Sequence, residues 1–534
     1  MDPGTGPKAR PNDSSTLAGA VLHGLTSAGL DTVFGVGGTH TLQLLGELER
    51  VPALRYIAAR TELGAAYMAI GFARAAGRAA ALLTSTGPGA LNVVAALQDA
   101  SWSCTPLVHL TTRIGDDRFA GALHETPAQG CILGLASKAV FDVGAADGAA
   151  ALAGAIAVAA QHPRGPVNLQ VSAGTWRDEW LPAGGPVLPG LAHPPEIPVD
   201  ALASAIAASS RPVIFAGGGA MAADGGAAVR LLASTIGAPV LTSNQGKGIG
   251  DWSDELYLGP WGWEPAVHQL FAEADLALVF GSKLSASGTG QWQLPLPAAS
   301  YAIGLPPLDH PRYPQLTPVA GDAAEVARSL QPAVTARASW ARQRVAQLRS
   351  GVLAAAAERG PAEMSCVASL SAEPATPRWV SFDMAKAGFW LMKYLPARRP
   401  GTHLFSGYLA MGTALPMAIG AAVATGEPSM AVVGDGGFQM SIAELATIAE
   451  HRLPITVLII VDGLYGLLRD NRLALGDAGT LGVELWNPDL PAVAEAYGIE
   501  CHHAADGEAL GKILATSADG PRLILLTSPF SRAW

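Results

Sequence analysis

The stretch that decides the fold is "VVGDGGFQMSIAELATIAEHRLPITVLIIVDG", residues 432–463. One apolar run ends in Gly434-Asp435-Gly436, and a second apolar run ends in Asp462-Gly463. Between them, Phe438 to Glu450 carry apolar residues at helical spacing. Short apolar strands that alternate with helices are typical of parallel sheets covered on both faces. Because ligands of such sheets bind at the carboxyl ends of the strands, we expect Asp435 and Asp462 to share one sheet edge.

The glycines around Asp435 predict an anion site that also contains a cation. Gly436 and Gly437 allow the backbone to approach a ligand closely, and the start of the next helix offers free N–H groups to a phosphate. A bare carboxylate at this position would repel a phosphate. We therefore interpret Asp435 and Asp462 as ligands of a Mg²⁺ ion that binds a diphosphate. The alternative is a pair of aspartates that cap ordinary helices or turns.

The strand–helix pattern continues along the rest of the chain, and two linkers interrupt it. Residues 181–200 are rich in proline and glycine, and residues 331–376 contain a charged helix that ends in "SAEPATP". The sequence thus predicts an α/β fold of three doubly wound parallel-sheet domains. Their expected bounds are residues 14–182, 196–332 and 376–534.

The composition narrows the classes of partner. Lysine and arginine are scattered and the net charge is −10, which argues against a nucleic-acid or anionic-membrane partner. The four cysteines lie far apart without metal-type spacing, so we expect free thiols in a reducing compartment. The N-terminus lacks the apolar core of a signal peptide, and no apolar run is long enough to span a bilayer. We therefore expect a cytoplasmic protein.

Three further stretches carry a family resemblance together with residues 432–463. They are "RTELGAAYMAIGFARAAG" (60–77), "TSTGPGALNVVAAL" (84–97) and "SGYLAMGTALPMAIGAA" (406–422). In this order they resemble segments of the thiamine diphosphate (ThDP) enzymes of the acetolactate synthase, benzoylformate decarboxylase and benzaldehyde lyase kind. The resemblance implies an N-terminal pyrimidine-binding domain, a central domain and a C-terminal diphosphate-binding domain, with ThDP and Mg²⁺ as cofactors. Some relatives bind FAD in the central domain, but glycine turns alone do not predict FAD here.

The resemblance also implies roles for particular residues at the cofactor. Glu62 falls on the glutamate that hydrogen-bonds the pyrimidine ring. The Leu409 carbonyl and the Met411 N–H would hold the aminopyrimidine, and the Met411 side chain would support the bent cofactor. The implied diphosphate and metal positions are Gly434, Asp435, Gly436, Gly437, Asp462 and the carbonyl of Leu464, with Asp435, Asp462 and Leu464 as the Mg²⁺ ligands. At Asp462 the family carries asparagine, so this chain adds a negative charge at the metal.

Two histidines complete the expected catalytic set. His40 follows the first strand, where benzaldehyde lyase-like enzymes also carry histidine, and His124 lies where acetolactate synthases carry glutamine and pyruvate decarboxylases carry histidine. Each histidine could exchange a proton with the substrate near neutral pH. The alternative for each is an ordinary polar histidine in a loop. His109 lies within an apolar strand, and we interpret it as a hydrogen-bonded core residue.

The resemblance implies an acetolactate synthase-like carboligase or lyase. Such an enzyme forms an enamine from a 2-oxo acid or acyloin and transfers the acyl unit to a carbonyl acceptor such as an aldehyde. A 2-oxo acid decarboxylase is the first alternative, and a catalytically silent cofactor-binding relative is the second. Asn471 stands where acetohydroxyacid synthases carry tryptophan, which argues against branched-chain amino-acid synthesis. The family's active site lies between subunits, so we expect a homodimer or homotetramer.

Overall fold

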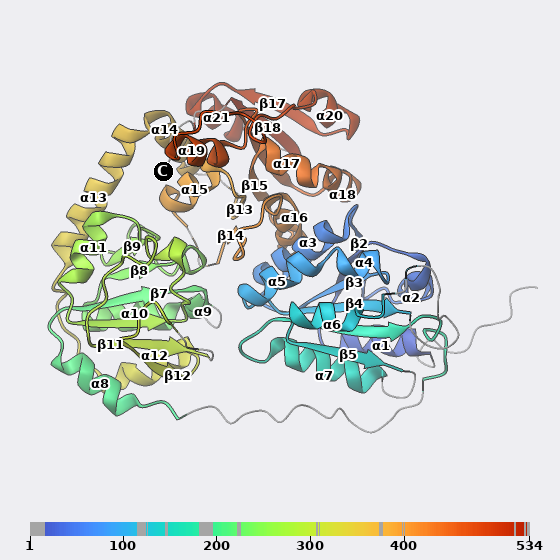
Figure 1. The fold of residues 1–534 in the computed structure, drawn as a ribbon, viewed down its shortest axis with the longest axis horizontal. Coiled ribbons are helices and arrows are strands. Elements are labelled where there is room, and N and C mark those ends of the chain that lie inside the picture. The colour runs from blue at the N-terminus through green and yellow to red at the C-terminus, as the bar shows by residue number, and fades with distance from the viewer. Residues whose placement is uncertain are drawn as a thin grey trace, which may run out of the picture. The chain divides into compact units, whose positions relative to one another are not determined.

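The structure is a computed structural model, and it describes residues 16–114, 124, 126–144, 148–180, 196–221, 226–305, 308, 310–372, 377–397, 399, 401–516, 520–527 and 530. It contains three sheets, each of six parallel strands, with helices between most successive strands (Figure 1). The described residues fall into two compact units, one within 1–73 and 78–191 and the other within 74–77 and 192–534. The predicted α/β class with three parallel sheets is confirmed. The predicted domain bounds stay predictions.

The first sheet has the strand order β2-β1-β3-β4-β6-β5. Its strands are β1 (Thr32–Gly35), β2 (Arg55–Ala58), β3 (Ala80–Thr84), β4 (Leu107–Arg113), β5 (Ala139–Val143) and β6 (Pro166–Ser172). Its helices are α1 (Leu17–Ser27), α2 (Leu42–Leu48), α3 (Glu62–Ala76), α4 (Pro88–Leu91), α5 (Val94–Trp102), α6 (Gln129–Leu135) and α7 (Gly148–Ala160).

One face of this sheet packs against α1, α2 and α7. Leu22 of α1, Leu44 of α2 and Leu152 of α7 are fully buried in one cluster with Leu83 and Leu110 of the strands. Burial of a leucine side chain contributes about 1.5–3 kcal/mol, so this layer supplies much of the unit's stability. The carboxyl ends of β1 and β3, where His40 and the "TSTGPG" turn follow, are thereby held on a rigid sheet.

The second sheet has the strand order β12-β11-β10-β7-β8-β9. Its strands are β7 (Pro212–Ala216), β8 (Val240–Thr242), β9 (Tyr257–Gly259), β10 (Leu276–Phe280), β11 (Ser300–Gly304) and β12 (Leu316–Ala320). The helices of this part are α8 (Val199–Ala208), α9 (Gly218–Met221), α10 (Ala227–Ile236), α11 (Pro265–Ala272) and α12 (Ala323–Leu330), followed by α13 (Arg342–Arg359) and α14 (Pro361–Ser371).

The third sheet has the order β14-β13-β15-β16-β18-β17, which repeats the order of the first sheet. Its strands are β13 (Trp379–Phe382), β14 (His403–Phe405), β15 (Ser429–Gly434), β16 (Ile455–Val461), β17 (Glu500–Ala504) and β18 (Arg522–Thr527). Its helices are α15 (Lys386–Tyr394), α16 (Ala414–Thr425), α17 (Asp435–Ser441), α18 (Leu445–His451), α19 (Gly466–Ala474), α20 (Leu490–Ala496) and α21 (Gly507–Leu514).

The helical segment after Gly434 is broken, which differs from the continuous helix that its spacing predicts. Helix α17 begins at Asp435, earlier than expected, and a 3-10 turn at 442–444 separates it from α18. Glu444 in this turn is buried and accepts the Thr447 hydroxyl at 3.1 Å. A buried carboxylate needs a hydrogen-bond donor, and here the donor is three residues further along the chain. The 3-10 turn places the two side chains within reach of each other.

Two smaller predictions can be compared with the structure. The four cysteines are free. His109 is fully buried, and its ring nitrogens lie 2.8 Å from the Thr84 hydroxyl and 2.7 Å from Oδ1 of Asn168. This confirms it as a hydrogen-bonded core residue. Among the described residues, no helix has the length and apolar character needed to cross a membrane.

Candidate active site

The carboxylate of Asp435 joins the ends of two neighbouring strands. Strands β15 and β16 are paired in parallel with Gly434 opposite Ile460, so their carboxyl ends meet. Asp435 is 1% exposed, and its Oδ2 accepts the backbone N–H of Asp462 at 3.1 Å and of Gly463 at 2.7 Å. The two aspartates that the sequence singled out therefore lie at one sheet edge.

Asn487 is a partner of Asp435 that the sequence reasoning missed. Its Nδ2 donates to Oδ2 of Asp435 at 2.7 Å, while its Oδ1 accepts Nε2 of Gln439 at 2.8 Å. The contact joins positions that are 52 residues apart, and Asn487 lies in a loop without a motif. No signal in the sequence singles it out. Its amide holds the carboxylate in one orientation, as outer-shell partners of metal ligands commonly do.

Asp462 and Leu464 form the second part of this edge. The side chain of Asp462 is exposed, and its Oδ1 accepts the N–H of Leu464 at 3.0 Å. Neighbouring protein atoms remove part of the water around the Asp462 carboxylate, and this desolvation raises its pKa above the ordinary value. The negative charge of the nearby Asp435 raises it further. A site that disfavours a second negative charge is one in which a divalent cation would be stabilised.

The residues at this edge fit a Mg²⁺–diphosphate group. Oδ1 of Asp435 accepts the N–H of Gly436 at 2.9 Å, and a carboxylate oxygen has a second lone pair for a cation. No cluster of three or more His, Cys, Asp or Glu that could hold a metal occurs in the described part of the chain. Two carboxylates and the carbonyl of Leu464 would therefore need further oxygens, which a diphosphate can supply.

A cavity of about 340 Å³ opens beside this edge. It is lined by Gly434, Gly436, Gly437, Asp462, Leu464 and Met411, and also by Asp383, Lys386 and Asn471. A Cβ at Gly437 would stand 2.1 Å from Oδ2 of Asp383, so a larger residue there would displace the buried Asp383 carboxylate. The structure thus brings most of the predicted diphosphate residues together with Met411 around one cavity.

Leu409 and Met411 lie in the loop between β14 and α16. Leu409 has a φ of 60°, a left-handed conformation that is uncommon for a leucine, and its side chain is 40% exposed. The backbone N–H of Ala410, the residue after Leu409, donates to the Ser406 hydroxyl at 2.9 Å. Backbone held in such a conformation is often associated with a functional site, and here it fixes the direction of the Leu409 carbonyl.

Asp383 is a second residue that the sequence reasoning missed. It follows β13, is 1% exposed, and accepts the N–H groups of Gly412 at 2.9 Å and Thr413 at 3.4 Å. Burial raises the pKa of Asp383 to about 6, although these N–H donors lower it. The bonds tie the end of β13 to the loop that carries Met411. The signal was available, since Asp383 is an acid directly after an apolar strand.

Glu62 lies in the other compact unit, at the first residue of α3. Its Oε2 accepts Nδ2 of Asn92 at 3.0 Å, and a Cβ at Gly89 would stand 3.4 Å from its Oε1. The carboxylate of Glu62 therefore faces the glycine turn after β3. The side chain of Asn92 orients it.

The same glycine turn lies beside both predicted histidines. The rings of His40 and His124 have centroids 6.3 Å apart and meet edge to face. A Cβ at Gly87 would stand 2.7 Å from the carbonyl oxygen of His124, and one at Gly38 would stand 2.6 Å from Cβ of Ser85. Partial burial lowers the pKa of His40, and the nearby His124 lowers it further. The structure thus brings His40 and His124 together at the turn that Glu62 faces.

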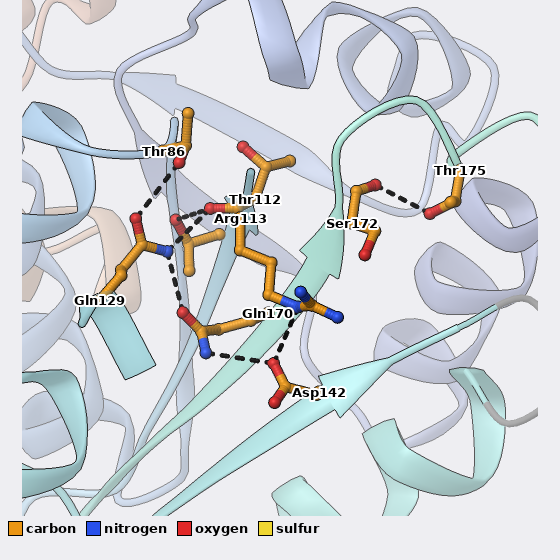
Figure 2. Close-up of polar contacts among 9 residues, drawn as sticks. Thr86, Thr112, Arg113, Gln129, Asp142, Gln170, Ser172 and Thr175 are labelled. Atoms are coloured by element: carbon orange, nitrogen blue, oxygen red, sulfur yellow. Dashed lines mark hydrogen bonds and ion pairs between the residues drawn. The ribbon is translucent and has the colours of Figure 1, made fainter. Parts of the chain in front are cut away.

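Gln129 fixes the position of this turn and was missed by the sequence reasoning. It is 2% exposed, and its Oε1 accepts the Gly87 N–H at 2.9 Å and the Thr86 hydroxyl at 3.2 Å. Its Nε2 donates to the Thr112 carbonyl and to Oε1 of Gln170, both at 2.9 Å. Figure 2 shows Gln129 between Thr86, Thr112 and Gln170, with Gln170 continuing to Asp142. A buried amide with four partners holds the turn in one position.

Comparisons with known proteins find matches along most of the chain. Three family models match: the thiamine pyrophosphate enzyme N-terminal TPP binding domain at residues 15–130, the central domain at 199–330 and the C-terminal TPP binding domain at 383–526. A probable 2-ketoarginine decarboxylase (AruI) of Pseudomonas aeruginosa is 31% identical over 95% of this chain and 92% of its own length. Two acetolactate synthase large subunits are each 28% identical. That of Parasynechococcus marenigrum covers 96% of this chain and 87% of itself, and that of Corynebacterium glutamicum covers 90% and 81%.

Proposed function

This chain belongs to the thiamine pyrophosphate enzyme family, and from that premise we propose that it is a ThDP- and Mg²⁺-dependent carboligase or lyase. It would take an acyl unit from a 2-oxo acid or an acyloin and transfer it to a carbonyl acceptor such as an aldehyde. The observation that carries the proposal is the bond from the buried Asp435 carboxylate to the backbone of Asp462, beside the Gly436-Gly437 turn.

Each residue set then has a task toward the cofactor. Asp435, Asp462 and the carbonyl of Leu464 would hold Mg²⁺, while the N–H groups of Gly436 and Gly437 would bind the diphosphate. The residues proposed for the aminopyrimidine are the carbonyl of Leu409, the backbone and side chain of Met411, and Glu62. When bound, ThDP supplies a centre that stabilises the carbanion of the donor.

The protein supplies proton positions around that centre. Glu62, oriented by Asn92, would share a proton with the pyrimidine ring nitrogen. The lowered pKa of His40 favours its neutral ring, which would accept a proton from a substrate hydroxyl. His124, with its ring beside that of His40, would bind the substrate oxygen on the same side. The glycine turn that Gln129 holds would set the spacing of these groups.

A 2-oxo acid decarboxylase is the second candidate function. The Pseudomonas aeruginosa relative, 31% identical over nearly the whole chain, is named as a probable decarboxylase of a 2-oxo acid. Both candidates would begin with the same donor and the same residues. They differ in whether a proton or a second carbonyl compound accepts the acyl unit.

A product assay separates these possibilities. The purified protein with ThDP and Mg²⁺ is incubated with a panel of 2-oxo acids, with and without an aldehyde, and the products are identified by mass spectrometry. An acyloin or acetohydroxy acid supports the carboligase. An aldehyde and CO₂ alone support the decarboxylase, and a protein that binds ThDP without converting any donor is the silent relative.

We also propose that the active unit is at least a dimer. Large apolar side chains are exposed near the cofactor cavity and on the loops that follow it, which is unusual for a surface that faces only water. These side chains are Tyr408, Leu409, Met440, Leu468, Leu473, Leu475, Leu481 and Trp486. Sedimentation with an activity assay tests the proposal, since a fully active monomer would contradict it.

A further inference from the structure

Lys386 is a buried lysine at an unfavourable position. Its side chain is 4% exposed, and it is the first residue of helix α15, at the positive end of the helix dipole. Burial and the dipole both disfavour an ammonium group unless anions lie nearby. One anion is Asp470, whose Oδ2 lies 2.6 Å from Nζ of Lys386. Asp470 belongs to the middle of α19, so the ion pair joins the start of α15 to the middle of α19.

Asp462 lies close to the same lysine. A Cβ placed on Gly466 would stand 3.1 Å from Cε of Lys386 and 3.3 Å from Oδ2 of Asp462. Both side chains therefore lie against Gly466. Lys386 and Asp462 also line the cavity together with Gly434 and Gly436. The side chain of Lys386 therefore lies on the side of the cavity where the diphosphate and the metal would bind.

The charges at this edge require a compensating cation. Asp435 and Asp462 are two carboxylates, whereas the enzymes that this chain resembles pair one aspartate with a neutral asparagine. A diphosphate adds further negative charge, which one Mg²⁺ does not neutralise. We propose that Lys386 is a diphosphate-binding residue of this chain that offsets the charge of Asp462, and that Asp470 holds its ammonium group in place. This inference depends on the proposed function, since it concerns the same cofactor site.

Calorimetric titration of ThDP in the presence of Mg²⁺ into the cofactor-free protein tests the inference without an activity assay. The set comprises wild type, Lys386→Gln, Lys386→Arg, Asp462→Asn and the double variant Lys386→Gln/Asp462→Asn. We expect Lys386→Gln to weaken ThDP binding at least about 10-fold. In the Asp462→Asn background the same change should cost less than about 3-fold, because the extra charge is gone. Lys386→Arg, which keeps the charge, should stay within about 3-fold of wild type.

The control is Lys393→Gln on the same helix. Lys393 is also buried and paired, with Oε1 of Glu264 2.6 Å from its Nζ, but it does not line the cavity. We expect its ThDP affinity to equal that of wild type. If Lys386→Gln alone does not fold, Lys386→Gln/Asp470→Asn removes the whole ion pair and replaces it in the comparison.

Four results would overturn the inference. One is a loss of affinity that is equal in both Asp462 backgrounds. A second is unchanged affinity with a lower melting temperature of the cofactor-free protein, which would assign Lys386 to the Asp470 pair alone. A third is an equal loss in Lys393→Gln, which would show a general effect of removing a buried charge. The fourth, a wild-type protein that binds no ThDP, would overturn the proposed function as well.

Discussion

Oδ2 of Asp435 accepts the backbone N–H of Asp462 at 3.1 Å, across the carboxyl ends of strands β15 and β16. The bond ties the residue that begins helix α17 to the residue that follows the next strand. It also holds the backbone of Asp462 beside the Asp435 carboxylate before any cation binds. Such preorganisation reduces the cost of ordering the ligands when the metal arrives.

The first prediction concerns Asp435→Asn. The amide can no longer accept hydrogen bonds on both oxygens, and the metal loses a charged ligand. We expect Mg²⁺-dependent ThDP binding to weaken by at least about 100-fold, because even outer-shell partners of metal ligands contribute 10–100-fold. Calorimetric titration measures the affinity. Asp489→Asn, which alters an exposed N-cap that accepts the Ala492 N–H in the same domain, should bind ThDP as wild type does.

The second prediction concerns Glu62→Gln. The substitution keeps the size and the contact with Asn92 but removes the group that would share a proton with the cofactor. We expect turnover to fall at least about 100-fold, the scale of a positioned acid–base group. Steady-state rates with the best donor measure it. Glu49→Gln, at the end of α2, serves as the control. A Glu62→Gln protein with normal turnover would remove Glu62 from the mechanism.

The third prediction concerns Gln129→Ala. The change leaves the Gly87 N–H and the Thr112 carbonyl without their buried partner. We expect a loss of about 2–4 kcal/mol in the free energy of unfolding, since each unpaired buried group costs about 1–3 kcal/mol. Denaturant unfolding measures this. Gln161→Ala, after the end of α7, should stay within about 0.5 kcal/mol of wild type. Equal stability of the two variants would contradict the role of Gln129.

The fourth prediction concerns pH. Burial lowers the pKa of His109 from 6.5 to about 4, although its bond to Asn168 raises it. The unfolded chain therefore binds this proton below pH 6.5, while the folded chain binds it only near pH 4. Stability should be fully present above pH 6.5 and should be lost as the pH falls towards 4, by up to about 3 kcal/mol from this group.

Unfolding at a series of pH values compares His109→Gln with wild type. The difference between the two isolates His109 from the other titrating groups. We expect the variant to show a shallower loss of stability between pH 6.5 and 4, whatever its stability at pH 7. His23→Gln, an exposed residue of α1, is the control and should keep the wild-type slope. Parallel curves for His109→Gln and wild type would contradict the prediction.

Sequence patterns predicted the parts of this protein whose signals are local. The apolar run "ITVLIIV" is strand β16, and the glycines beside Asp435 line a cavity at its end. The patterns missed Gln129, Asn487 and the Lys386–Asp470 pair. Each of these makes at least one contact with a residue more than 40 positions away, which no local spacing shows. The 3-10 break at 442–444 was also missed, because apolar periodicity does not register a buried glutamate.

The first and third sheets repeat one strand order, and their strand ends correspond. His40 follows the first strand of one sheet as Lys386 follows the first strand of the other. The third strands end at Thr84 and Gly434, and each runs into a glycine-rich turn. Such equivalence is what duplication of an ancestral domain would leave behind. After duplication, one copy would have kept a histidine after its first strand and the other a lysine, on the same strand order.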